Sequence, residues 1–160
     1  MDKYTVDDIM NLRPCPKYTG EFVAELWAGH ESISLTDMCR LNIPVGDIIW
    51  AVTRLIPARD ARLFACDCAE HVLHIYEAKY FGDSQPRKCI EVIRSWIEGK
   101  VDDGSHAVAK PSDWDAAVAF AEPVAWASAC VSDWAVELKW QLGCLVTYVE
   151  NDKQKEKSCT

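Results

Sequence analysis

Carboxylates and imidazoles gather in one short stretch of this chain, residues 60–77, where side chains capable of acid–base or metal chemistry are densest. Asp67, His71 and His74 follow one another at intervals of four and three residues, which places them on one face of a helix. A carboxylate and two imidazoles are ligands that divalent metals accept. The stretch lacks both the His-Glu-x-x-His order of zinc-binding helices and the Glu-x-x-His pair of di-iron bundles, however. We therefore predict no metal and no cofactor, with a metal or small-ligand site at Asp67, Glu70, His71 and His74 as the alternative.

The acids of this stretch have possible partners in the segment that follows. Glu70 and Glu77 share a second helical face, and the next helical segment carries Arg87, Glu91 and Arg94 after a glycine turn. Antiparallel packing of the two segments would bring the guanidinium groups near the acids. Bidentate arginine–carboxylate pairs in a partly buried seam fix the register of two helices and add little net stability. We predict a structural ion-pair network here, and a binding pocket built from the same residues is the alternative.

No pattern elsewhere in the chain indicates catalysis. The Gly-x-Ser-x-Gly, Walker and glycine-rich phosphate-binding motifs are missing from the sequence. Cys66 and Cys68 are two residues apart, so they point about 200° apart on a helix and cannot share an ion. His30 and His106 fall in predicted loops without a local partner. We predict that the protein is not an enzyme.

Helical signals position these side chains. The segment 58–80 is apolar almost all the way round, so other helices must surround it. No convincing strand alternation is found, which disfavours α/β nucleotide-binding folds. We predict an all-α, single-domain antiparallel helical bundle of about seven or eight helices, with a central long helix near residues 58–80. The other helices are expected to begin near Thr5, Gly20, Ser34, Pro44 (at the first helical position), Pro86, Ser112 and Pro123, the last one running to Glu150.

Length and composition suit one folded domain. We expect residues 1–150 to form it, with the short helices of residues 1–43 packed on the rest, and residues 151–160 to be a disordered tail. No apolar run is long enough for a membrane span, and the first residues lack a basic start followed by an apolar stretch. With eight cysteines and no export signal, we expect reduced thiols and a cytoplasmic protein.

The net charge of −8 is unevenly placed. Residues 102–150 hold eight acids and two bases, whereas residues 41–101 are neutral. An acidic surface repels nucleic acid and suits a basic protein partner. In the acidic region tryptophans alternate with carboxylates, as in an anchor-and-rim interface. We predict that the partner-binding residues are Asp113, Trp114, Asp115, Glu122, Asp133 and Glu137. Val131, Leu138 and Leu145 recur every seven residues, and this seam could also join two copies in a homodimer.

Two motifs resemble a known group. They are Arg62-Leu-Phe-Ala-Cys-Asp-Cys-Ala-Glu-His-Val-Leu-His-Ile-Tyr-Glu77 and Asp83-Ser-Gln-Pro-Arg-Lys-Cys-Ile-Glu91. They are similar to those of the small bacterial and phage-borne "putative immunity proteins", helical proteins rich in alanine and tryptophan. In the second motif Gln85 and Cys89 replace the arginine and alanine expected for that group. The resemblance covers about residues 44–150.

The resemblance implies a function but no catalytic residues. It implies a non-enzymatic inhibitor that binds and occludes a protein target, as an immunity protein or a phage anti-defence or anti-CRISPR-type factor does. The target would be a toxin, nuclease or defence-system component in the cytoplasm of a bacterial or phage-infected cell.

Overall fold

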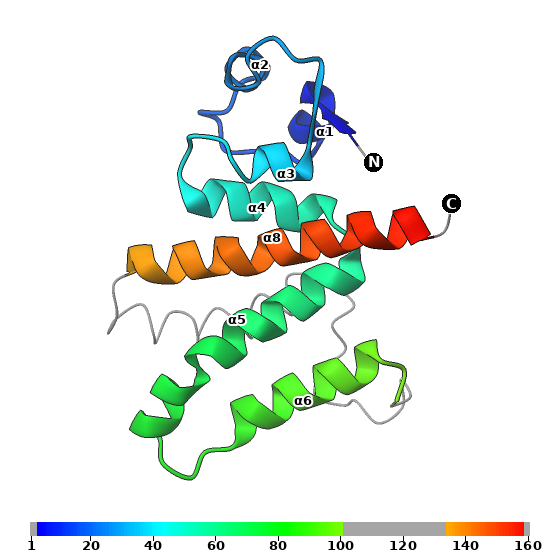
Figure 1. Cartoon of the computed structure of the whole chain (residues 1–160). Helices are drawn as coiled ribbons and strands as arrows, with labels where there is room; N and C mark the ends of the chain where they lie inside the picture. Colours follow the sequence, from blue (N-terminus) through cyan, green and yellow to red (C-terminus); the bar gives the residue numbers. More distant parts are fainter. Residues whose placement is uncertain (1–2, 101–133, 159–160) are drawn as a thin grey trace. The chain divides into compact units, whose positions relative to one another are not determined.

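The computed structural model describes residues 3–100 and 134–158, and these residues are predominantly helical, as predicted (Figure 1). The side chains of residue 134 and of residues 152–158 are outside this description. The described elements are β1 (Lys3–Thr5), α1 (Val6–Asn11), α2 (Gly20–Leu26), β2 (Ser32–Ser34), α3 (Leu35–Met38), α4 (Val45–Leu55), α5 (Ala58–Lys79), α6 (Gln85–Ile97) and α8 (Trp134–Ser158). The helix expected from Ser112 and the expected start of the last helix near Pro123 lie outside the described residues.

Contacts group the described residues into two compact units. The first contains the chain up to Ile56 together with α8 from Leu138, and the second contains the residues from Pro57 to Glu137. The single domain over residues 1–150 stays a prediction. No helix among the described residues has both the length and the apolar character needed to cross a membrane.

The first unit contains a two-stranded antiparallel sheet that the sequence analysis did not predict. β1 and β2 pair Lys3 with Ser34 and Thr5 with Ser32. Strands of three residues are too short to show an alternating pattern, which explains why they were missed. Each strand ends at a residue that caps the following helix. Thr5 caps α1 and Ser34 caps α3, each in a capping box with the aspartate three residues on.

The core of the first unit is built from short amphipathic helices and α8. Val52 and Leu145 are completely buried, and Trp27 and Ile48 are 2% exposed. Pro44 is the N-cap of α4, one position before the first helical position predicted for it. Because Leu145 is buried within the chain, it is not available for the homodimer contact predicted at this seam.

The second unit contains the hairpin of α5 and α6, joined by a turn at Gly82 (Figure 1). The turn needs a glycine because its φ is +90°, in the left-handed region. The long helix predicted near 58–80 is α5. Between the two helices lies a small hydrophobic core of Cys66, Ala69, Leu73, Ile90 and Ile93, with Ile97 packed against it. The two helices that carry the polar side chains are therefore held together by a hydrophobic core.

Helix α8 continues to Ser158, beyond the end near Glu150 expected for the last helix. The added residues include three lysines, one glutamine and one glutamate, which are good helix formers, and no glycine or proline to stop the helix. The segment 151–158, expected to be a disordered tail, is therefore part of α8.

Candidate functional site: the α5–α6 hairpin

Arg94 of α6 reaches two carboxylates of α5 at once. Its Nη2 donates to Oδ1 of Asp67 and to Oε2 of Glu70, both at 2.7 Å. The Arg94 side chain is 31% exposed and that of Asp67 is 27% exposed, so this cluster is partly shielded from water. Burial alone would lower the pKa of Arg94, but the two carboxylates outweigh it and the pKa is raised. The guanidinium therefore pairs with two acids of the neighbouring helix at once.

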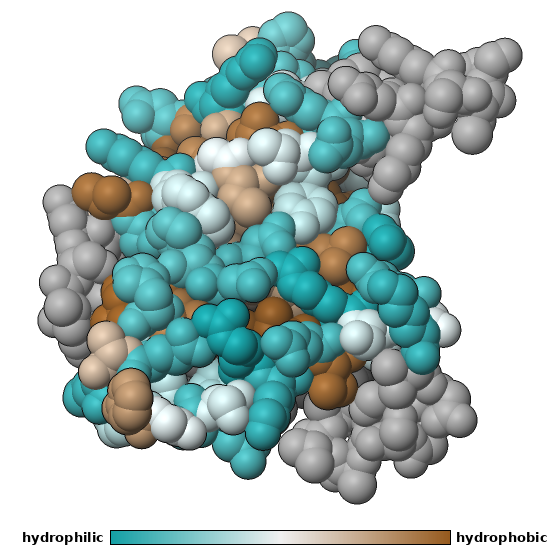
Figure 2. Space-filling view, turned by 60° about the horizontal axis from the view of Figure 1, so that its bottom comes forward, coloured by the Kyte–Doolittle hydropathy of each residue, from teal (hydrophilic) through white to brown (hydrophobic). Residues whose placement is uncertain are grey.

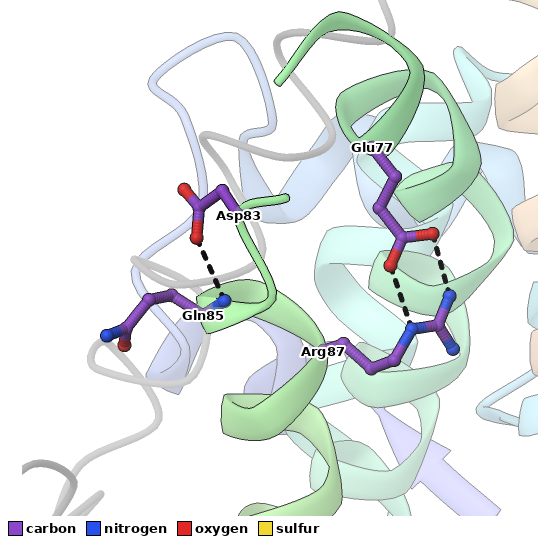
Figure 3. A network of polar contacts seen from close by, with 4 residues as sticks. All are labelled: Glu77, Asp83, Gln85 and Arg87. Atoms are coloured by element: carbon purple, nitrogen blue, oxygen red, sulfur yellow. Dashed lines mark hydrogen bonds and ion pairs between the residues drawn. The ribbon is translucent and has the colours of Figure 1, made fainter. Parts of the chain in front are cut away.

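A second pair closes the hairpin near its turn (Figure 3). Arg87 donates from Nε to Oε1 of Glu77 and from Nη2 to Oε2, both at 2.8 Å. These hydrogen bonds hold the pKa of Glu77 below its usual value. In the turn, Asp83 accepts from the backbone N–H of Gln85 at 2.9 Å and from the Tyr76 hydroxyl at 2.7 Å. The turn and the bidentate pair together fix how α6 folds back on α5.

Two ion pairs of the network predicted from the sequence are present, Glu70 with Arg94 and Glu77 with Arg87. Glu70, Glu77, Arg87 and Arg94 are brought together, whereas Glu91 is exposed and forms no ion pair within the described residues. Asp67 was assigned to the metal alternative, and the structure places it in the ion-pair cluster instead. Asp67 lies three residues before Glu70 in the sequence, and this spacing indicates that one cation can reach both acids.

The histidines of α5 have other partners. His71 Nδ1 lies 3.0 Å from Oε2 of Glu137, at the start of α8, and His74 Nδ1 lies 3.0 Å from the His71 carbonyl. Within the described residues no three His, Cys, Asp or Glu side chains come together as a metal site would require. The alternative of a metal site at Asp67, His71 and His74 therefore has no support in this part of the chain.

One residue predicted to bind a partner, Glu137, is buried in the structure. It is 6% exposed and bonded to His71, because the chain returns it to α5 across 66 residues of sequence. No local pattern could have revealed this pairing. A buried carboxylate cannot serve in an exposed acidic surface. The other residues predicted for that surface, Asp113, Trp114, Asp115, Glu122 and Asp133, lie outside the described residues.

The comparison with protein families bears on this same hairpin. Residues 56–133 match the family model described as "Imm-5 like putative immunity protein". The segment is Imm-5 like. The resemblance to the immunity-protein group is confirmed, because both motifs that carried it lie inside the match. No curated protein and no solved structure matches the chain significantly.

The tip of the Imm-5 like hairpin presents aromatic side chains to solvent. Phe81 is completely exposed and Tyr80 is 47% exposed. The Tyr80 ring packs against the Tyr76 ring at an angle of 38°, with centroids 4.7 Å apart, and the Lys79 ammonium lies over Tyr80. Hydrophilic residues prevail on the face of the molecule shown in Figure 2, with hydrophobic ones in small separate groups. An exposed phenyl ring beside an ordered tyrosine is suited to anchoring a protein partner.

Cys66 is poorly suited to thiol chemistry. Burial raises the pKa of the Cys66 thiol to about 11, although the charge of Arg94 acts in the opposite direction. A thiol with that pKa is almost entirely protonated at neutral pH and is a poor nucleophile. Cys66 thus packs in the hairpin core, as an apolar residue would.

Proposed function

We propose that this protein is a non-enzymatic inhibitor that binds and occludes a protein target, in the manner that the name of its matched family suggests. The observation that carries the proposal is the match of residues 56–133 to the Imm-5 like family. The hairpin is consistent with it. Its acids Asp67, Glu70 and Glu77 are paired with arginines, its core is packed, and its aromatic tip is exposed, which suits a rigid docking element better than a reaction centre.

The partner that best fits the charge of this chain has a basic surface. The chain carries −8 overall, and most of the excess lies in residues 102–150. We therefore propose a basic toxin, nuclease or defence-system component as the target, and no direct contact with nucleic acid. The contact would use the acidic residues Asp113, Asp115, Glu122 and Asp133 with Trp114, in the cytoplasm of a bacterial or phage-infected cell.

Co-purification followed by mass spectrometry tests whether a target exists. Tagged protein is expected to retain one host or phage protein at stoichiometric level from a bacterial lysate. Raising the salt concentration should slow association. At 0.1 M salt, exposed charges more than about 10 Å apart are largely screened from each other, so unlike charges no longer steer the two proteins together. Failure to retain any stable protein, or association indifferent to salt, would contradict the proposal.

Neutralising charge tests the acidic surface. The variant D113N/D115N/E122Q/D133N should associate with the isolated target about tenfold more slowly at low salt. The control D7N/E21Q/E25Q/E31Q removes the same number of charges from exposed positions near the start of the chain. It should bind as the wild type does. Equal effects of the two variants would mean that association depends on the net charge of the chain and not on this acidic surface.

Truncating the aromatic tip tests the hairpin separately. Phe81→Ala should weaken target binding at least about tenfold if the exposed ring is an anchor. Phe22→Ala removes another exposed ring, in α2 of the first unit, and serves as the control. Equal affinities for wild type and Phe81→Ala would exclude the tip from the interface.

A further inference from the structure

The first unit contains a cavity of about 200 Å³, lined by residues from α1, α2, α3, α4 and the loops between them. Its walls are mostly apolar and include Trp27, Met38, Ile48 and Trp50. Such a volume is a little larger than the apolar cavity of about 150 Å³ that accepts a benzene ring. The cavity therefore has room for one aromatic ring or an aliphatic group of similar size.

One of the charged side chains lining the cavity is already neutralised. Asp47 accepts from Lys17 Nζ at 2.8 Å and from the Tyr18 hydroxyl at 2.6 Å. Burial alone would raise the pKa of Asp47, but the hydrogen bonds from Lys17 and Tyr18 outweigh it and the pKa is lowered. Asp47 is thus an ionised carboxylate with its partners in place, and it offers little to a cationic ligand.

The other charged lining residue is Arg13, which has no such partner. Its side chain is exposed and forms no ion pair with any residue that the structure describes. The turn after α1 holds the Arg13 backbone at φ +56°, with its N–H donating to the Met10 carbonyl at 3.0 Å. A guanidinium beside apolar walls matches a carboxylate, which it can bind through two parallel hydrogen bonds.

We propose that this cavity binds a small monocarboxylate whose apolar body is about the size of one aromatic ring. The apolar walls take the body, and Arg13 takes the carboxylate. All the lining residues precede residue 56, outside the segment that matches the Imm-5 like family. The inference therefore does not depend on the proposed function.

Three compounds of one shape and different charge test the proposal. They are 3-phenylpropionate, the neutral 3-phenylpropionamide and the cationic 3-phenylpropylamine, titrated into the full chain by calorimetry and by amide NMR. We expect the carboxylate to bind at least about tenfold more tightly than the amide, and the amine to bind least. Shifts of amide signals should concentrate on the lining residues. Absence of carboxylate binding at millimolar concentration, or tighter binding of the amine, would overturn the proposal.

Two variants and one control test which lining residues bind the ligand. Arg13→Gln should lower affinity for the carboxylate about tenfold and remove its advantage over the amide. The control Arg40→Gln, at an exposed arginine outside the cavity lining, should change neither. Ala51→Leu, which adds bulk to the lining, should weaken the carboxylate and the amide alike, with unchanged circular dichroism. Equal carboxylate affinity in Arg13→Gln and Arg40→Gln would overturn the assignment to Arg13.

Discussion

The guanidinium of Arg94 is shared by two acids that lie three residues apart on α5. Without it, Asp67 and Glu70 would repel each other on one helical face, and Asp67 would lose a partner in a partly buried position. Exposed ion pairs add little to stability, but a cation that serves two acids also removes this repulsion. Arg94 therefore stabilises the fold mainly by reducing the repulsion between Asp67 and Glu70.

Replacing Arg94 tests this view. We expect Arg94→Gln to lower the free energy of unfolding by about 1–2 kcal/mol. Arg94→Lys should lower it less, because an ammonium keeps the positive charge and can also donate to more than one acceptor, as Nη2 of Arg94 does. Urea denaturation measures the change. Lys88→Gln is the control, since Lys88 is exposed on the same helix and forms no ion pair among the described residues. A loss in Arg94→Gln no larger than the loss in Lys88→Gln would contradict the argument.

The polar cluster around Asp47 predicts how stability depends on pH. The folded-state pKa of Asp47 is lowered from its ordinary value of 3.8. A carboxylate of this kind stabilises the fold above its unfolded-state pKa, and the contribution is lost as pH falls through the lower folded-state pKa. We expect Asp47→Asn to be less stable than the wild type at pH 7 and to lose less further stability below pH 3.8.

Thermal unfolding followed from neutral pH down to about pH 2 measures this difference, since the window must extend below both pKa values. Glu31→Gln, at an exposed position outside the cluster, is the matched control. Parallel curves for the wild type and Asp47→Asn across the acid range would show that the hydrogen bonds from Lys17 and Tyr18 do not stabilise the charged form.

At the scale of elements, the sheet of the first unit is tied to two helix starts. Ser34 ends β2 and caps α3, where its hydroxyl donates to Asp37 Oδ2 at 2.6 Å and accepts from the Asp37 N–H at 3.2 Å. By contrast, Ser84 is the N-cap of α6 without a side-chain capping bond. The two serines therefore occupy the same kind of position with different hydrogen bonding.

This pair gives a matched test of capping. Ser34→Ala should cost about 1 kcal/mol, because the first turn of α3 loses its hydrogen-bond acceptor. Ser84→Ala should cost less than about half of that, because no capping bond is lost. Chemical denaturation of both variants measures the costs. Equal costs would indicate that the capping box contributes nothing beyond the preference of serine for the N-cap.

The elements differ in how far the sequence could predict them. The starts of α1 and α3 were predictable because Thr5 and Ser34 each precede an acid at capping-box spacing. The α5–α6 ion pairs were predictable because a short turn forces neighbouring helices to be antiparallel. The pairing of His71 with Glu137 and that of β1 with β2 join residues far apart in the chain, and local periodicity carries no information about such contacts.

At the scale of the whole molecule, α8 belongs to both compact units. Its first residues up to Glu137 lie in the second unit, and its residues from Leu138 lie in the first. Helix formation is cooperative, so unfolding of one end of a continuous helix destabilises the adjacent turns. The single domain over residues 1–150 stays a prediction, and its test is whether both units unfold together.

Leu73→Ala tests that cooperativity. Leu73 is 1% exposed in the hairpin core of the second unit, so its truncation should cost about 2–5 kcal/mol. If the chain unfolds as one domain, native-state hydrogen exchange should accelerate by the same factor in the most protected amides of α4 and of α5, because both exchange through global unfolding. Acceleration confined to α5 and α6 would mean that the second unit opens by itself, and the single domain would be replaced by two units that share a helix.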